Sequence, residues 1–201
     1  NAVEVEKFYK SLKLTWIKRM VTDSEGAWRQ LLQSRLGVFK LQDLLRLKMC
    51  NALLAKLKIP KFYKEIITEY QLLLRTPVNA FQVRTQSLWH NEHIKVNGKA
   101  LFLKHPYLVG IKLIDDIVNL EGNIMNINQI KEKYPTVRLN FLTMQSIARA
   151  IPAAWKAMIR QNPNNTLNPQ DKDDIMILTG SEKYMPLAQF RSRDFYSILL
   201  E

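Results

Sequence analysis

Residues 62–74 read FYKEIITEYQLLL, and this stretch decides the fold class. Its apolar residues recur at steps of three and four: Phe62, Ile66, Tyr70 and Leu73, with Tyr63, Ile67 and Leu74 beside them. That spacing places them on one face of an α-helix. Pro60 precedes the stretch and Pro77 follows it, and proline does not continue a helix interior. The sequence therefore predicts a helix over 62–74.

The same helical period appears on both sides of this stretch. It predicts helices over 8–20, 41–57, 107–120, 126–132, 140–151, 153–160 and 193–200. In the first of them Phe8, Leu12, Trp16 and Met20 form the expected apolar stripe, and Leu14 and Ile17 lie next to it. A further helix carries Trp28, with Ser24 as its expected N-cap. Cys50 falls within 41–57, so we expect a buried thiol there.

One segment in the middle of the chain has a different period. Ile94 and Val96 alternate with polar residues, and Asn97-Gly98 then precedes a second alternating run. Asn-Gly is a strong hairpin signal because both residues tolerate the positive φ of a type I′ turn. We expect Val96 to pair with Lys99 in a hairpin over about residues 93–103. The predicted fold class is mostly α: an irregular helical bundle with one central β-hairpin.

We expect three regions along the chain. Residues 1–76 form a basic helical subdomain, 77–162 contain the hairpin with further helices, and 163–201 form a polar connector and a short terminal helix. The first division is expected around 76–87. The apolar fraction of 47% is ordinary for a globular protein, and 201 residues are enough to bury a core.

The positive charge is concentrated in the first third of the chain. Residues 1–64 contain 14 Lys and Arg against 5 Asp and Glu, a net of +9, whereas residues 65–201 have a net of +3. A basic surface interleaved with aromatics is typical of proteins that contact nucleic acid. We expect contacts with RNA or DNA phosphates without base recognition. The residues expected to make them are Lys13, Lys18, Arg19, Lys56, Lys58, Lys61 and Lys64.

The aromatics among these cations have two possible roles. Trp16, Trp28 and Phe62 lie on the apolar stripes, which favours packing in the core over stacking on bases.

No catalytic or metal-binding pattern is legible. His90 and His93 have a spacing used by some metal sites, but they flank a predicted strand and no cysteine accompanies them. Asp115-Asp116 are expected on the solvated face of the 107–120 helix rather than around magnesium. Glycine-rich phosphate loops and nucleophile elbows are absent. We therefore expect no catalytic residues, no metal and no cofactor in this chain.

The chain shows no apolar run of the roughly 20 residues that a membrane span needs, so we expect no membrane partner. It begins with Asn1 and no secretory segment follows, which suggests a piece of a longer intracellular polypeptide, in the cytoplasm or nucleus. The oligomeric state stays open.

A series of motifs gives the chain a family resemblance. They are 12–19 (LKLTWIKR), Trp28, 60–66 (PKFYKEI), 88–91 (LWHN), 94–99 (IKVNGK), 110–112 (GIK) with Asp115-Asp116, 140–142 (NFL), 150–152 (AIP) and 191–196 (RSRDFY). In order and spacing they resemble the region that follows the polymerase core in LINE-type non-LTR retrotransposon reverse transcriptases. Each motif alone is unspecific, but the series covers nearly the whole chain.

The resemblance implies a helical segment that helps to hold template RNA and target DNA for target-primed reverse transcription. The polymerase aspartate motif, the endonuclease and the cysteine/histidine knuckle of that family are not in this sequence. The expected parent is an RNA-directed DNA polymerase with an endonuclease, its other domains are expected partners, and this chain alone is not an enzyme. The alternative is a helical protein–protein interaction module retained from a retrotransposon remnant, docking through residues such as Phe62, Tyr63 or Trp89.

Overall fold

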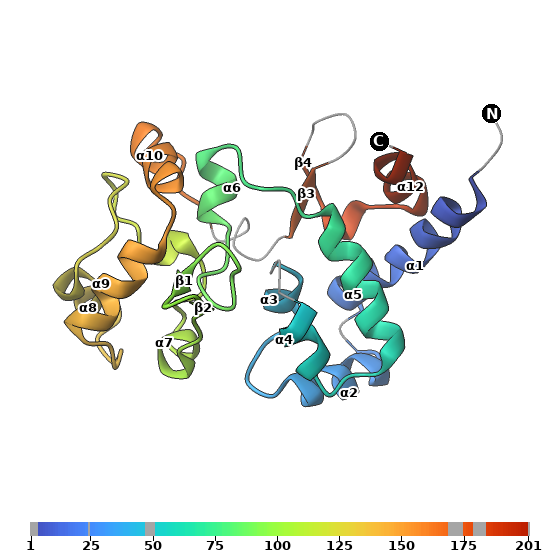
Figure 1. Cartoon of the computed structure of the whole chain (residues 1–201), viewed down its shortest axis with the longest axis horizontal. Coiled ribbons are helices and arrows are strands. Elements are labelled where there is room, and N and C mark those ends of the chain that lie inside the picture. Colours follow the sequence, from blue (N-terminus) through green and yellow to red (C-terminus); the bar gives the residue numbers. More distant parts are fainter. Residues whose placement is uncertain (1–3, 24, 47–50, 169–174, 179–183, 201) are drawn as a thin grey trace. The chain divides into compact units, whose positions relative to one another are not determined.

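The structure, a computed structural model, describes residues 4–23, 25–46, 51–168, 175–178 and 184–200 (Figure 1). The chain is mostly α-helical, as predicted, and its described residues form two small antiparallel sheets of two strands each. It divides into two compact units. Unit 1 is Asn1–Arg75 with Asp173–Glu201, and unit 2 is Thr76–Lys172.

This partition differs from the three regions expected from the sequence, because the C-terminal segment belongs to unit 1. The terminal helix packs on the first helix: the ring of Tyr196 meets that of Phe8 edge-on at 6.2 Å, and its hydroxyl accepts a 3.1 Å hydrogen bond from the backbone N–H of Glu4. The boundary between the units falls between Arg75 and Thr76, at the start of the expected division. A short helix follows it, capped by Asn79, whose side chain accepts from the N–H of Gln82.

Unit 1 is built from helices and one small sheet. Its elements are α1 (Val5–Thr22), α2 (Ala27–Leu36), α3 (Leu41–Leu45), α4 (Asn51–Lys56), α5 (Lys61–Leu73), β3 (Met176–Leu178), β4 (Tyr184–Pro186), η2 (Leu187–Gln189) and α12 (Ser192–Leu200). The large side chains buried in its core include Leu14, Ile17, Met20, Leu44, Leu45, Ile66, Ile67, Tyr70, Phe190 and Phe195.

The predicted apolar stripe of the first helix is partly wrong. α1 contacts α5 and α12, and the face that it buries carries Ser11, Leu14 and Ile17 as well as Met20. Phe8 is 46% exposed and Leu12 is 43% exposed. The sequence of α1 has apolar residues on two faces of the helix. The helices that cover α1 determine which of these two faces is buried.

Two other helices of unit 1 differ from their predicted bounds. α2 begins at Ala27 with Gly26 as its N-cap, whereas Ser24, the expected cap, lies outside the described residues. The predicted helix 41–57 contains both α3 and α4. α3 ends at Leu45, because the N–H of Arg46 already bonds the carbonyls of Asp43 and Leu44. Cys50 also lies outside the described residues.

The helix predicted over 62–74 is confirmed as α5, which buries Ile66, Ile67 and Tyr70. A sheet that the sequence did not predict lies near the end of unit 1. β3 pairs antiparallel with β4, with Ile177 opposite Met185.

Unit 2 holds the predicted hairpin among short helices. Its elements are α6 (Ala80–Arg84), β1 (Lys95–Val96), β2 (Lys99–Ala100), α7 (Lys104–Leu108), η1 (Ile114–Ile117), α8 (Ile127–Lys133), α9 (Phe141–Ala150) and α10 (Ala153–Gln161). Val96 pairs with Lys99 as predicted, and Asn97 and Gly98 have φ angles of 51° and 75°, in the left-handed region of a type I′ turn.

The helix predicted over 107–120 is wrong. α7 ends at Leu108, and only the single turn of η1 follows. The chain turns at Val109 and Gly110 and then bonds to the segment after α6. The N–H of Leu88 donates to the carbonyl of Lys112, and that of Ile114 donates to the carbonyl of Gln86, both at 2.9 Å. These two bonds satisfy backbone groups that a continuous helix would have bonded internally.

The last three helices of unit 2 follow the sequence signals closely. Asn126 caps α8 in a capping box with Gln129, and Asn140 caps α9 by accepting from the N–H of Thr143. Pro152 separates α9 from α10. Within the described ranges, none of the helices combines the length and the apolarity needed to span a bilayer.

Candidate nucleic-acid interface

Three of the predicted contact residues meet between α1 and α5. Lys13, Lys61 and Lys64 line a shallow surface depression of about 290 Å3, together with Thr68 and two carboxylates, Glu65 and Glu69. The Nζ of Lys13 is 3.5 Å from Oε2 of Glu65, and that of Lys61 is 3.9 Å from Oε1. Glu65 therefore partly offsets the positive potential here, and a bound phosphate would compete with it.

Lys56 and Lys58 lie next to this depression, where α4 leads into α5. The Nζ of Lys64 donates a 2.8 Å hydrogen bond to the carbonyl of Ala55, which ties the two helices together at this corner. Both Lys56 and Lys58 are exposed. Within the described part of the chain, neither side chain has an ion pair or hydrogen bond, so both ammonium groups face solvent.

The aromatic residues of this region form a surface cluster, so the expectation that they belong to the core is wrong. Trp16 packs edge-on against Phe62 at 5.5 Å and against Trp28 at 5.9 Å, and Tyr63 stacks on Trp28 at 6.0 Å. Phe62 is 39% exposed, and the other three are half-buried. The buried core residues of α5, Ile66, Ile67 and Tyr70, lie further along the same side of the helix.

Cations border this aromatic cluster. The guanidinium of Arg19 lies over the ring of Trp16, 4.7 Å from its centroid. Lys18 is half-buried and lies two positions after Trp16 on α1, so the two side chains leave the helix on different faces. We call the following residues the basic surface of unit 1: Lys13, Arg19, Lys56, Lys58, Lys61 and Lys64, with Trp16, Trp28, Phe62 and Tyr63.

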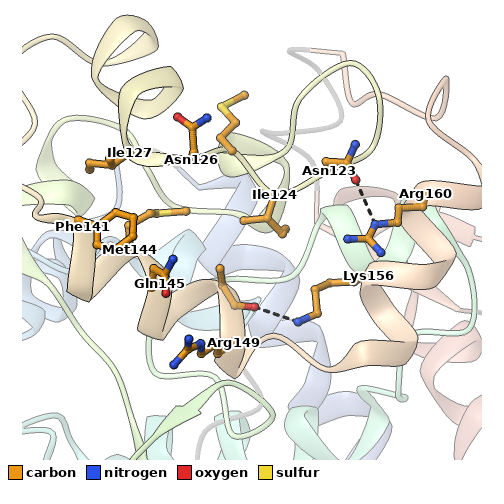
Figure 2. A pocket seen from close by; sticks show the side chains of 12 residues that line it. Asn123, Ile124, Asn126, Ile127, Phe141, Met144, Gln145, Arg149, Lys156 and Arg160 are labelled. Carbon is orange, nitrogen blue, oxygen red and sulfur yellow. Dashed lines mark hydrogen bonds between the residues drawn. The ribbon is translucent and has the colours of Figure 1, made fainter.

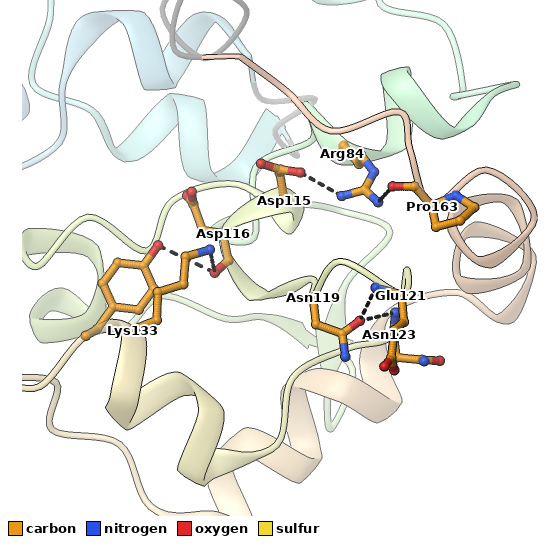
Figure 3. A network of polar contacts seen from close by, with 9 residues as sticks. Arg84, Asp115, Asp116, Asn119, Glu121, Asn123, Lys133 and Pro163 are labelled. Carbon is orange, nitrogen blue, oxygen red and sulfur yellow. Dashed lines mark hydrogen bonds and ion pairs between the residues drawn. The ribbon is translucent and has the colours of Figure 1, made fainter.

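The aspartate pair, expected on a solvated helix face, is buried instead. Asp115 and Asp116 are 7% and 6% exposed in η1. Asp115 accepts a 2.8 Å bond from Nη1 of Arg84, which is itself 1% exposed, and Nη2 of Arg84 donates to the carbonyl of Pro163 at 3.1 Å (Figure 3). Among the described residues, Nε of Arg84 has no hydrogen-bond partner. A buried ion pair of this kind holds α6, η1 and the segment after α10 together.

Asp116 caps the same turn. Its Oδ2 accepts from the backbone N–H groups of Lys112 and Leu113, both at 2.8 Å, while its carbonyl accepts from Nζ of Lys133 (Figure 3). Both carboxylates are therefore used in structural bonds. No group of three or more His, Cys, Asp or Glu among the residues that the structure describes is placed to hold a metal ion.

His90 is a titratable group of unit 2 whose environment shifts its pKa. Its backbone has φ of 54°, and its ring stacks on Phe102 at 4.7 Å. Burial lowers the pKa of His90 below its ordinary value, because desolvation disfavours the imidazolium.

We expect His90 to make unit 2 less stable in acid. The unfolded chain takes up the proton on His90 near pH 6.5, but the folded chain takes it up only at lower pH. The stability linked to His90 is therefore fully present above pH 6.5 and is lost as the pH falls from 6.5 toward the lower pKa of the folded chain. Urea unfolding at pH 7.5 and 5.5 should show a smaller acid loss in His90→Asn, since Asn also tolerates positive φ. An equal loss in both proteins would contradict this assignment.

A second basic site lies wholly in unit 2 and was missed from the sequence. A cleft of about 430 Å3 lies between the 123–127 segment, α9 and α10 (Figure 2). Arg149, Lys156 and Arg160 line it, and no carboxylate does. The three residues are eleven positions apart at most and form no charge run, so only the turn at Pro152 brings them to one cleft.

Comparison with protein-family models, curated proteins and solved structures finds no match for this chain.

Proposed function

We propose that the chain is a non-catalytic, nucleic-acid-binding helical segment of a LINE-like reverse transcriptase, acting in the cytoplasm or nucleus. It contacts the phosphate backbone of template RNA or target DNA through the basic surface of unit 1. The remaining domains of the parent protein carry the polymerase and endonuclease chemistry. The order of the sequence motifs supports the family assignment, and the geometry of unit 1 supports the binding role.

The observation that carries the binding role is the placement of cations around exposed aromatics. The rings of Trp16 on α1 and Phe62 on α5 are in contact. Arg19 lies over the ring of Trp16, and Lys61 precedes Phe62 in the sequence, so both helices bring a cation to this contact. Lys56 and Lys58 add exposed charge at the adjoining corner. Phosphates meeting such a surface release counterions without any base being read. Glu65 weakens the centre of this surface, so the corner lysines carry most of the attraction.

A salt series tests the proposal. The full chain should bind structured RNA and a primed RNA–DNA duplex, with affinity falling as salt rises. Each phosphate contact contributes about 0.9 to the slope of log affinity against log salt on B-form DNA. Changing Lys56, Lys58 and Lys61 to Gln should therefore reduce the slope by about 2–3, measured by fluorescence anisotropy between 50 and 300 mM salt. The triple change spares Lys64, which bonds the backbone.

The matched control changes three exposed lysines of unit 2, Lys95, Lys99 and Lys131, to Gln. It removes the same formal charge and should leave most of the slope. An equal drop in both variants would mean that only total charge matters. No binding at 50 mM salt by the unaltered chain would refute the proposal.

A protein–protein interaction module remains the second candidate, and one observation favours it. α1 leaves Val5, Phe8, Tyr9 and Leu12 between 43% and 78% exposed at helical spacing, which forms an apolar face beyond its core face. Trp89, one of the residues expected to dock a partner, is 1% exposed and donates its indole N–H to the carbonyl of Ile111 at 2.6 Å, so it belongs to the core. A partner retained after nuclease treatment and lost in Tyr9→Ser would favour this candidate.

A further inference from the structure

We infer that the cleft of unit 2 binds one unpaired nucleotide of a single strand, with the base at its apolar end and the flanking phosphate at its basic end. This goes beyond the phosphate contacts proposed for unit 1, because it adds a site that requires a base. The two sites lie in separate units and share no residue, so the proposal for each site can be tested independently of the other.

The cleft has two chemically distinct ends. Ile127, Phe141 and Met144 lie toward one end, Lys156 and Arg160 toward the other, and Ile124 lies between them (Figure 2). Met144 is 3% exposed and forms a fixed floor, whereas Phe141 is 56% exposed at the rim. An exposed phenyl ring over an apolar floor offers a stacking surface for a planar base.

The basic end is positioned before any ligand arrives. Nε of Arg160 donates to Oδ1 of Asn123 at 3.1 Å, and Nζ of Lys156 donates to the carbonyl of Ala148 at 3.0 Å (Figure 2). Among the residues described by the structure, the terminal guanidinium nitrogens of Arg160 make no further bond, so they are available to an anion. Arg149 lies at the end of α9 with its side chain exposed, and within the described residues it has no ion pair. Three cations without a lining carboxylate distinguish this cleft from the depression around Glu65.

Amide side chains complete the match to a nucleotide. Asn123, Asn126 and Gln145 line the cleft. Oδ1 of Asn126 accepts from the N–H groups of Asn128 and Gln129, so its NH2 group remains to donate. Amide groups of this kind recognise the edges of unpaired bases. The volume of about 430 Å3 lies within the range of about 300–1,000 Å3 usual for small-ligand sites.

The test compares two strands of equal charge. A labelled single-stranded 12-mer and an abasic 12-mer carry the same phosphates, so any difference in affinity for the full chain reports bases. We expect the base-containing strand to bind about tenfold tighter, since stacking on one aromatic residue has an effect of that order. Phe141→Leu should bring the ratio close to one while leaving the salt slope unchanged.

The basic end has its own variant and controls. Arg149→Gln with Arg160→Gln should lower the salt slope for the single strand by about 1.4, at about 0.7 per contact. Leu142→Ala is the matched control for Phe141→Leu, because Leu142 is 74% exposed on the same helix but does not line the cleft. The change of Lys56, Lys58 and Lys61 to Gln should weaken both strands alike and keep their ratio, which separates failure of this site from failure of the unit 1 surface.

Two results would overturn the inference. One is equal affinity of the unaltered chain for the two strands, and the other is a base preference that survives Phe141→Leu. Tight binding of free adenosine monophosphate together with equal affinity for the two strands would assign the cleft to a free nucleotide instead.

Discussion

Asp115→Ala is expected to destabilise unit 2 by about 3–5 kcal/mol. Arg84 is 1% exposed, and Asp115 holds its Nη1 at 2.8 Å. Removing the carboxylate leaves a buried guanidinium that, among the residues described by the structure, donates to the Pro163 carbonyl alone, since its Nε has no partner there either. A domain of this size has an unfolding free energy of about 5–15 kcal/mol, so the loss is a large part of the total. Hydrogen exchange at unit 2 amides measures it without interference from unit 1.

The double variant Arg84→Met with Asp115→Leu separates the two components of that loss. Replacing both charges by apolar side chains removes the desolvation cost as well as the attraction, so the double variant should lie within about 1 kcal/mol of the unaltered chain. If the double variant were as unstable as Asp115→Ala, packing rather than the uncompensated charge would be the cause.

Gly122→Ala is expected to cost about 2–5 kcal/mol. Gly122 has φ of +76°, where an L side chain costs about 1–2 kcal/mol. An added Cβ would also lie 2.8 Å from the carbonyl oxygen of Ile159 and 3.1 Å from Cα of Arg160. Both are backbone atoms near the end of α10, and displacing them costs about a further 1–3 kcal/mol. The same displacement would move Arg160 away from Asn123, so strand binding at the cleft should weaken too.

Gly98→Ala is the matched control for this variant. Gly98 has nearly the same φ, +75°, but no atom lies within 4 Å of the position that its Cβ would take. Urea unfolding of the two variants therefore isolates the clash from the backbone strain. Equal losses would show that α10 yields to the extra methyl group without cost.

Local signals in the sequence predict much of the fold. Asn126 and Asn140 are N-caps that predict where α8 and α9 begin, and Asn97-Gly98 predicts the register of the hairpin. These features depend on residues within a few positions of one another. The helix over 107–120 failed for the opposite reason: residues 112–114 bond to residues 86–88, and no local pattern reports a pairing across that distance.

The same distinction separates the two candidate sites. A run of lysines around Pro60 is visible in the sequence, but the partial neutralisation by Glu65 depends on α1 lying beside α5. The burial of Asp115 likewise depends on Arg84, 31 positions away. The unit 2 cleft corresponds to no charge run in the sequence, because its three basic residues come from two helices, α9 and α10. The cleft is basic because no carboxylate lines it, and not because its cations are numerous.

Unit 1 combines the two ends of the described chain, and this has a consequence for synthesis on the ribosome. Residues 1–75 emerge before unit 2, yet α12, which packs on α1, is made only after all of unit 2. At about 5–20 residues per second the delay is roughly 6–25 s. Unit 2 can fold during this interval, while α1 lacks part of its final covering. In the nascent chain, α1 is therefore partly uncovered until α12 has been made.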